Sequence, residues 1–312
     1  VAETPTVTGA AAATATLQED TDILLDLNVT INDNDASETV SQVRISGLTS
    51  IGEQNLTGIL VDGSGNLVGS SDGSGTTILT SAEYNAALAG TTPIYFRPPT
   101  DYSGNVSLNI VAVVQEPNGS TATSASSTFS FTLDPVSEMP DVSLTDVSVV
   151  EFTNDSSIDD VTTYKTDLSN ITVSLSDTSN LSEVTIVLSP ADSVTGNDPG
   201  FTLDATSVTS FDSSYNFTVS STSPLTIKVS GTVADGSSLG TDLVADMTTL
   251  LSEVKLVPPE DYSGTSTITT SVTSRETGAE ESPATTDNFD ITVSAVAETP
   301  TVTGAAAATA TL

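Results

Sequence analysis

The stretch VSLNIVAVV, residues 106–114, carries apolar side chains at every second position, namely Val106, Leu108, Ile110, Ala112 and Val114. Successive side chains of a β-strand point to opposite faces, so this alternation predicts a half-buried strand. The same alternation returns along the chain at 7–17, 27–31, 129–133, 171–175, 184–188 and 225–229. Clusters of Gly, Asn, Asp and Ser separate these segments, which is typical of short strands joined by turns. We therefore predict an all-β chain of antiparallel β-sandwiches.

Two segments break the alternation and predict short helices. Thr80 and Glu83 match a capping box at the start of the segment 81–89, and apolar residues follow helical spacing in 242–251. Both segments precede a motif that occurs twice in the chain. We expect each helix to cross over between the two sheets of its domain.

The chain is internally repetitive. The motif PPTDYSG at 98–104, just before the opening stretch, returns as PPEDYSG at 258–264, a shift of 160 residues. VSEMPDV at 136–142 returns as VAETPTV at 296–302 with the same shift. Repeats of about this length correspond to single domains. We predict two tandem Ig-like (cadherin-like) domains in an extended array, at 1–137 and 138–297, and the first strand of a further repeat at 298–312.

The seventeen residues VAETPTVTGAAAATATL occur at both 1–17 and 296–312. Such identity indicates a longer period, so the chain is predicted to be part of a tandem array whose units contact their neighbours in the same chain. The strand at 296–312 has no partner sheet of its own in this sequence. We expect it to be mobile or to pair with a sheet edge of a neighbouring molecule, and the chain otherwise to be monomeric.

The composition is strongly acidic. Forty-one Asp and Glu face six Lys and Arg, which gives a net charge of −35, and the chain contains no Cys, His or Trp. A surface of this charge repels nucleic acid and anionic membranes, so we expect neither as a direct partner. Without Cys, no disulfide can cross-link the domains of an extracellular array. A bound cation is the obvious substitute.

Acidic residues are concentrated after the strand at 27–31. In TINDNDASETVS, Asp33, Asp35 and Glu38 lie within six residues of one another, and few bases exist to neutralise them. These carboxylates either are solvated in a loop or hold a cation. Oxygen ligands without His or Cys favour a hard ion, and irregular loops suit Ca²⁺ better than Mg²⁺. The spacing does not match an EF-hand, because Glu38 stands where that loop needs Gly.

Topology predicts where these acids gather. In an Ig-like sandwich, the chain entry, the loop after the second strand and the turn before the last strand share one end, while the alternate loops lie at the other. Carboxylates from distant segments should therefore meet at the domain ends and at the junction, although the solvated-loop interpretation stays open. The candidate calcium ligands are Glu3, Asp33, Asp35, Glu38 and Glu116 above the first domain; Glu19, Asp20, Asp22, Asp101, Glu138 and Asp141 below it; Asp177, Glu183 and Glu276 above the second; and Asp155, Asp261 and Glu298 below it.

Three blocks carry a family resemblance: DNDASETVSQVRISGL, PPTDYSG, and the EPNG turn whose following strand leads to VSEMPDV. In combination they resemble the tandem Ig-like repeats of giant calcium-dependent RTX adhesins of Gram-negative bacteria. The resemblance implies extender domains of a secreted, outer-membrane-anchored protein that hold an adhesive tip away from the cell, as in biofilm formation. It also implies calcium ligands at the acidic positions of the blocks, which are Asp33, Asp35, Glu38, Asp101, Glu116 and Glu138. The sequence departs from the pattern at Ala36, where the family has Gly, and in SLSDTSNLSEV, which has no D-x-D pair.

Other functions were weighed against a calcium-rigidified spacer. Paired carboxylates could catalyse glycoside hydrolysis, but the absence of His, Cys and Trp and the placement of acids at domain ends disfavour an enzyme. A sugar- or ice-binding module and a surface-layer subunit remain alternatives. Exact duplication of the opening strand favours a spacer, because length is obtained by copying units. Calcium would then cross-link the lower loops of one domain, the linker and the upper loops of the next.

Overall fold

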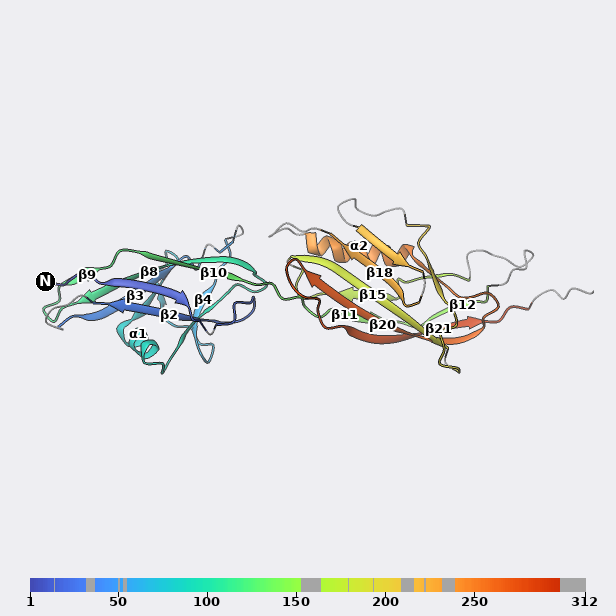
Figure 1. Cartoon of the computed structure of the whole chain (residues 1–312), viewed down its shortest axis with the longest axis horizontal. Coiled ribbons are helices and arrows are strands. Elements are labelled where there is room, and N and C mark those ends of the chain that lie inside the picture. Colours follow the sequence, from blue (N-terminus) through green and yellow to red (C-terminus); the bar gives the residue numbers. More distant parts are fainter. Residues whose placement is uncertain are drawn as a thin grey trace, which may run out of the picture.

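The computed structural model describes the chain except residues 14, 32–36, 50, 53–54, 153–163, 179, 193, 209–215, 222, 232–238 and 298–312, and except the side chains of 239–241. It contains two β-sandwich units placed end to end, which are called unit one and unit two (Figure 1). Unit one ends with β10 (Ser127–Leu133) and unit two begins with β11 (Asp141–Leu144). The segment 134–140 between them is called the linker, and the predicted domain boundary lies within it.

Unit one consists of two sheets packed face to face. One sheet has the order β1-β2-β7-β4, and the other has β10-β8-β3-β6-β5 with β9 paired to β8. The strands are β1 (Thr6–Ala11), β2 (Ile23–Thr30), β3 (Thr39–Ser46), β4 (Ile59–Asp62), β5 (Ser70–Ser71), β6 (Thr76–Thr80), β7 (Ile94–Arg97), β8 (Gly104–Gln115) and β9 (Thr121–Thr123). Phe96 of β7 and Phe131 of β10 meet edge to face across the core, with ring centroids 5.7 Å apart.

The opening stretch forms the centre of this core. Val106, Leu108, Ile110, Ala112 and Val114 lie on β8 and are all fully buried. All strand pairs in unit one that involve named strands are antiparallel. The predicted alternation and the all-β antiparallel sandwich are thus confirmed for this unit.

Unit two has one large sheet and two small ones. The large sheet has the order β12-β21-β20-β15-β18-β17, the second has β13-β19-β16, and β11 pairs with β14. The strands are β12 (Val147–Val150), β13 (Thr166–Asp167), β14 (Ile171–Ser174), β15 (Leu181–Asp192), β16 (Thr202–Asp204), β17 (Asn216–Ser220), β18 (Leu225–Ser230), β19 (Lys255–Val257), β20 (Gly264–Glu276) and β21 (Thr285–Ser294).

One strand pair departs from the antiparallel prediction. The entering chain first pairs with one sheet through β11 and then crosses to the other, where β12 pairs with β21 in parallel. The first and last strands of the sandwich run in the same direction, so neighbouring them requires parallel pairing. Unit one keeps only an isolated parallel bridge at the same place, between Gln18 and Asp134.

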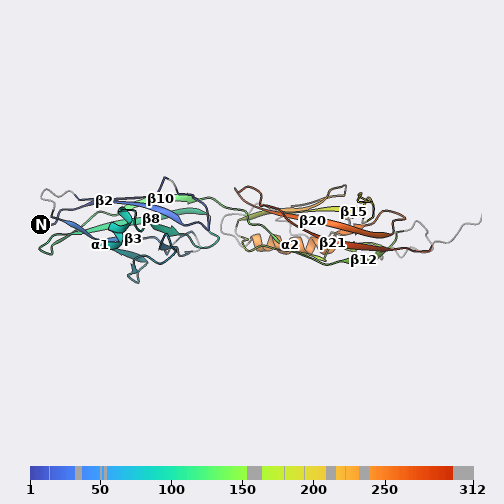
Figure 2. The ribbon, with the colours of Figure 1, turned by 90° about the horizontal axis from the view of Figure 1, so that it is seen from below.

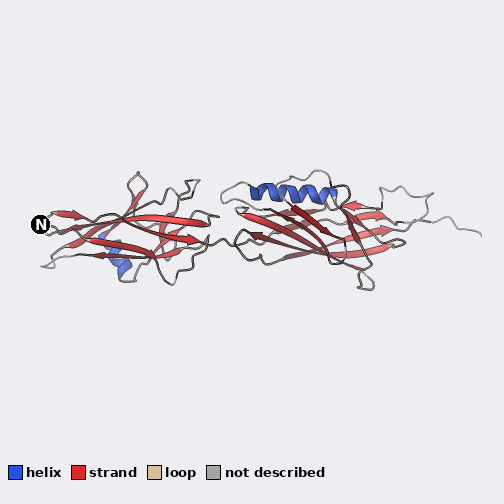
Figure 3. Cartoon of the chain, turned by 45° about the horizontal axis from the view of Figure 1, so that its top comes forward, coloured by secondary structure: helices blue, strands red, loops and turns tan. Residues whose placement is uncertain are grey.

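Both predicted helices are present and both connect the two sheets of their unit. α1 (Ser81–Leu88) begins with the capping box of Thr80 and Glu83 and joins β6 to β7. α2 (Leu239–Glu253) joins β18 to β19 and is longer than the predicted segment. Its apolar stripe covers one face of unit two (Figure 3), with Leu243 and Leu250 fully buried. Neither helix in the described part of the chain has the length and apolar character that crossing a membrane requires.

Candidate metal centre

Hydrogen bonds attach the linker to both units. On the side of unit one, the N–H of Glu19 donates to the carbonyl of Asp134 at 3.1 Å, and the N–H of Val136 donates to Oε1 of Glu19. On the side of unit two, the N–H of Glu276 donates to Oγ of Ser137 at 2.9 Å. The hydroxyl of Ser274 donates to the carbonyl of Glu138. The linker therefore brings Glu19 of one unit and Glu276 of the other to the same place.

Carboxylates of both units meet beside the linker. One oxygen from each of Glu19, Asp177 and Glu276 lies within 4.8 Å of the other two. The three residues are only 3%, 4% and 2% exposed. Glu19 precedes β2, Asp177 lies in the loop before β15, and Glu276 ends β20. These segments are far apart in the sequence, so the cluster exists only when the two units are docked.

A second cluster adjoins the first. Single oxygens of Asp20, Asp101 and Glu138 also lie within 4.8 Å of one another. Asp20 and Asp101 have φ values of 55° and 57°, a left-handed conformation that Asp tolerates better than most residues. The N–H of Asp101 donates to Oδ1 of Asp20 at 3.1 Å. The two clusters together are called the junction centre: Glu19, Asp20, Asp101, Glu138, Asp177 and Glu276.

The electrostatics of the junction centre oppose ionisation. Burial, followed by repulsion from Glu19 and Asp177, raises the pKa of Glu276 to about 9. Burial raises the pKa of Glu19 to about 7. Burial, followed by repulsion from Asp177, raises the pKa of Asp101 to about 6. Because Asp177 raises the pKa in both clusters, the six carboxyl groups act as one electrostatic unit.

The donor set fits a hard cation. Oε2 of Glu19 and Oε2 of Glu276 are buried and find no hydrogen-bond partner among the described residues. No ion pair found in the described part of the chain reaches either side chain. Buried carboxylates are costly unless a counter-charge is present. All the donors are oxygens, which Ca²⁺ and Mg²⁺ prefer, and burial is not consistent with a solvated loop for Glu19 and Glu276.

A third cluster caps the other end of unit one. Single oxygens of Glu3, Glu38 and Glu116 lie within 4.8 Å of one another. The N–H of Glu3 donates to Oε1 of Glu38, and Oγ of Ser37 donates to Oε2 of Glu116 at 2.8 Å. Glu3 precedes β1 as Glu138 precedes β11, so this cluster takes its residues from the same places as the upper half of the junction centre.

Four other candidate ligands lie outside these clusters. Asp22 forms a bidentate ion pair with Arg97, with both N–O distances 2.7 Å. Glu183 pairs with Lys228 at 2.5 Å. Asp141 is exposed at the start of β11, and Asp261 is exposed at the lower end of unit two. The remaining candidates, Asp33, Asp35, Asp155 and Glu298, and the strand predicted at 298–312, lie outside the described residues.

Sequence reasoning missed Glu151. Its Oε2 accepts from the N–H of Val296 at 2.8 Å, and its own N–H donates to the carbonyl of Ser294 at 2.9 Å. Glu19 makes the same two contacts with Val136 and Asp134, each 160 residues earlier than the partners of Glu151. Glu151 is therefore the counterpart of Glu19. The signal was hidden because the two acids are not themselves separated by 160 residues.

The comparisons with known proteins are consistent with this architecture and assign no family. Neither a protein-family model nor a curated protein matches the chain. Similar solved structures include extracellular cadherin domains 1–5 of protocadherin gamma B2, with 12% identity, a TM-score of 0.33, and coverage of 95% of this chain and 41% of that one. The D00–D0 domain of intimin has 11% identity and a TM-score of 0.23, covering 90% of this chain and 98% of that one. A tetra-tandem repeat in the extending region of a large adhesion protein has 15% identity and a TM-score of 0.23, covering 93% and 50%.

The chain thus spans less than half of the protocadherin structure. With these identities and TM-scores, the fold class rests on the strand pairing described above.

Proposed function

We propose that the chain is a structural spacer from a cell-surface adhesin, and that calcium locks its successive β-sandwich units into a stiff rod outside the cell. The observation that carries this proposal is the junction centre, which combines carboxylates of unit one, the linker and unit two. A cation held there contacts both units at once. The proposed role is mechanical and involves no catalysis.

Repulsion explains why a cation would change the mechanics. The chain carries a net charge of −35, and six of its carboxyl groups converge on one junction. When they are ionised without a counter-charge, they favour bending that separates the units. A divalent cation held by Glu19, Asp177 and Glu276, or by Asp20, Asp101 and Glu138, would supply that counter-charge. Bending would then require breaking bonds to the ion.

Calcium suits these clusters better than magnesium. Each cluster draws its oxygens from loops and strand ends rather than from one regular element. Ca²⁺ accepts six to eight oxygens in flexible geometry, whereas Mg²⁺ demands a near-ideal octahedron and keeps several of its waters. The predicted family resemblance points to the same ion.

The arrangement of the units supports a spacer. In two perpendicular views they follow one another along the long axis of the chain (Figures 1 and 2). The duplicated opening sequence indicates that the same unit recurs in the array. Copies joined in this way add length in one direction.

Small-angle scattering tests the stiffening. We expect the maximum dimension in calcium to be that of two units in line, and we expect chelation to give a broader distribution with more compact, bent conformers. Magnesium at equal ionic strength controls for charge screening. Equal curves in calcium and chelator, or full recovery by magnesium, would overturn the calcium-specific mechanism.

A further inference from the structure

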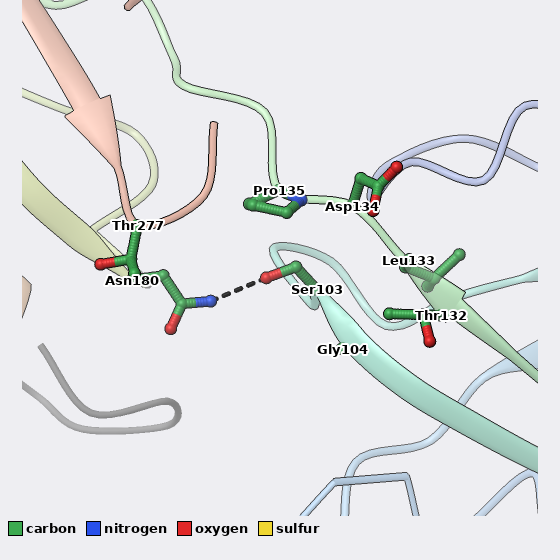
Figure 4. Close-up of a pocket in the computed structure, with 8 residues that line it drawn as sticks. All are labelled: Ser103, Gly104, Thr132, Leu133, Asp134, Pro135, Asn180 and Thr277. Carbon is green, nitrogen blue, oxygen red and sulfur yellow. Dashed lines mark hydrogen bonds between the residues drawn. The ribbon is translucent and has the colours of Figure 1, made fainter. Parts of the chain in front are cut away.

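A small cleft lies between the units beside the linker (Figure 4). It has a volume of about 210 Å³, and its walls come from unit one, the linker and the tips of two loops of unit two. Across it, Nδ2 of Asn180 donates to Oγ of Ser103 at 2.7 Å. This hydrogen bond joins the two units directly and involves neither the linker nor any carboxylate of the junction centre.

The donor is held by its own backbone. Asn180 has φ 55°, and its carbonyl accepts from the N–H of Thr277 at 2.9 Å. Asn180 follows Asp177 by three residues, and Thr277 directly follows Glu276. The amide of Asn180 is therefore fixed relative to the two residues that unit two contributes to the junction centre.

The acceptor belongs to the repeated motif. Ser103 is the serine of PPTDYSG, two residues after Asp101 of the junction centre, and it is 6% exposed. Its counterpart in PPEDYSG, Ser263, is exposed at the lower end of unit two. The same motif thus buries its serine where a following unit is docked and exposes it where the described chain has none. Burial of Ser103 is a consequence of docking rather than of the motif.

We propose that Ser103 and Asn180 are positioning residues that fix the rotation of unit two about the linker before any cation binds. The pair places Asp177 and Glu276 opposite Glu19, so the cation meets a preformed site. A preformed site avoids the ordering cost of binding, so loss of one such hydrogen bond should weaken calcium binding about 2- to 10-fold. This role in calcium binding rests on the proposed function, but the positioning itself does not.

The test uses S103A and N180G. Gly at 180 removes the amide and retains the left-handed backbone that Ala would strain. Because the chain has no Cys, L67C and T286C allow one spin label on an exposed site of each unit. In chelator, we expect S103A and N180G each to widen the distribution of distances between the labels, and the double variant to be no wider than the broader single variant. S263A, the same change in the undocked motif, should match the parent protein.

Calcium titration of the unlabelled variants completes the test. We expect S103A and N180G to bind calcium about 2- to 10-fold more weakly than S263A. Distance distributions of S103A and S263A that coincide in chelator would overturn the positioning role. A widened distribution with unchanged calcium affinity would overturn preorganisation. If the parent protein binds no calcium, the proposed function fails, while the distances in chelator still decide whether the pair positions the units.

Discussion

Calcium at about 10 mM is expected to raise the melting temperature of the chain by about 10 °C over the chelated protein. Extracellular calcium modules bind with dissociation constants of about 10⁻⁴ to 10⁻³ M, which at this concentration corresponds to roughly 1 to 3 kcal/mol for each site. The junction centre contains two clusters, and a third caps unit one. About 1 kcal/mol moves the melting temperature of a domain of this size by a few degrees.

Scanning calorimetry in calcium, in magnesium and in chelator, all at one ionic strength, measures this shift. Screening acts equally in the two salts, so it cannot produce a difference between calcium and magnesium. A melting temperature that is the same in calcium and in chelator would show that the clusters hold no ion that stabilises the fold.

In chelator, the chain is expected to lose stability as the pH rises from about 5 to about 9. The pKa values of Glu276, Glu19 and Asp101 are raised in the folded state, to about 9, 7 and 6, chiefly by burial. The folded protein therefore binds more protons than the unfolded chain in this range. Its stability falls as the pH rises through the folded pKa values. One unit of difference corresponds to about 1.4 kcal/mol, so the total loss is on the order of a few kcal/mol.

The variant E276Q isolates the contribution of the junction. In chelator it should be more stable than the parent protein at about pH 9 and show a flatter dependence on pH, because the buried charge is gone. In calcium the order should reverse, since a ligand is lost. E280Q changes an exposed acid in the neighbouring turn and should behave as the parent protein in both conditions. An E276Q profile identical to that of E280Q would contradict the assigned role of Glu276.

Strand alternation was sufficient to predict the sandwich. The apolar positions of 106–114 form the buried face of β8, because a two-residue period can bury only one set of side chains. The crossover helices were also predictable, since a capping box and helical spacing are local signals. The parallel pairing of β12 with β21 was not, because it depends on the entering chain changing sheets within unit two.

The junction was predictable as a place but not residue by residue. Topology alone indicates which loops share an end, and five of the six acids of one junction end were named on that basis with their neighbours. It does not indicate cross-strand partners: Asp22 pairs with Arg97 because Ile23 lies opposite Phe96 in the register of β2 and β7. Glu183 lies beside Lys228 because β15 pairs with β18. These contacts depend on register, which one sequence does not reveal.

The most direct test is a crystal structure of the chain grown in calcium, with anomalous diffraction used to locate the ions. The account predicts an anomalous peak between Glu19, Asp177 and Glu276 and another between Asp20, Asp101 and Glu138, each bonded to carboxylate oxygens. Crystals with the two units docked as described and no calcium in either cluster would contradict the account.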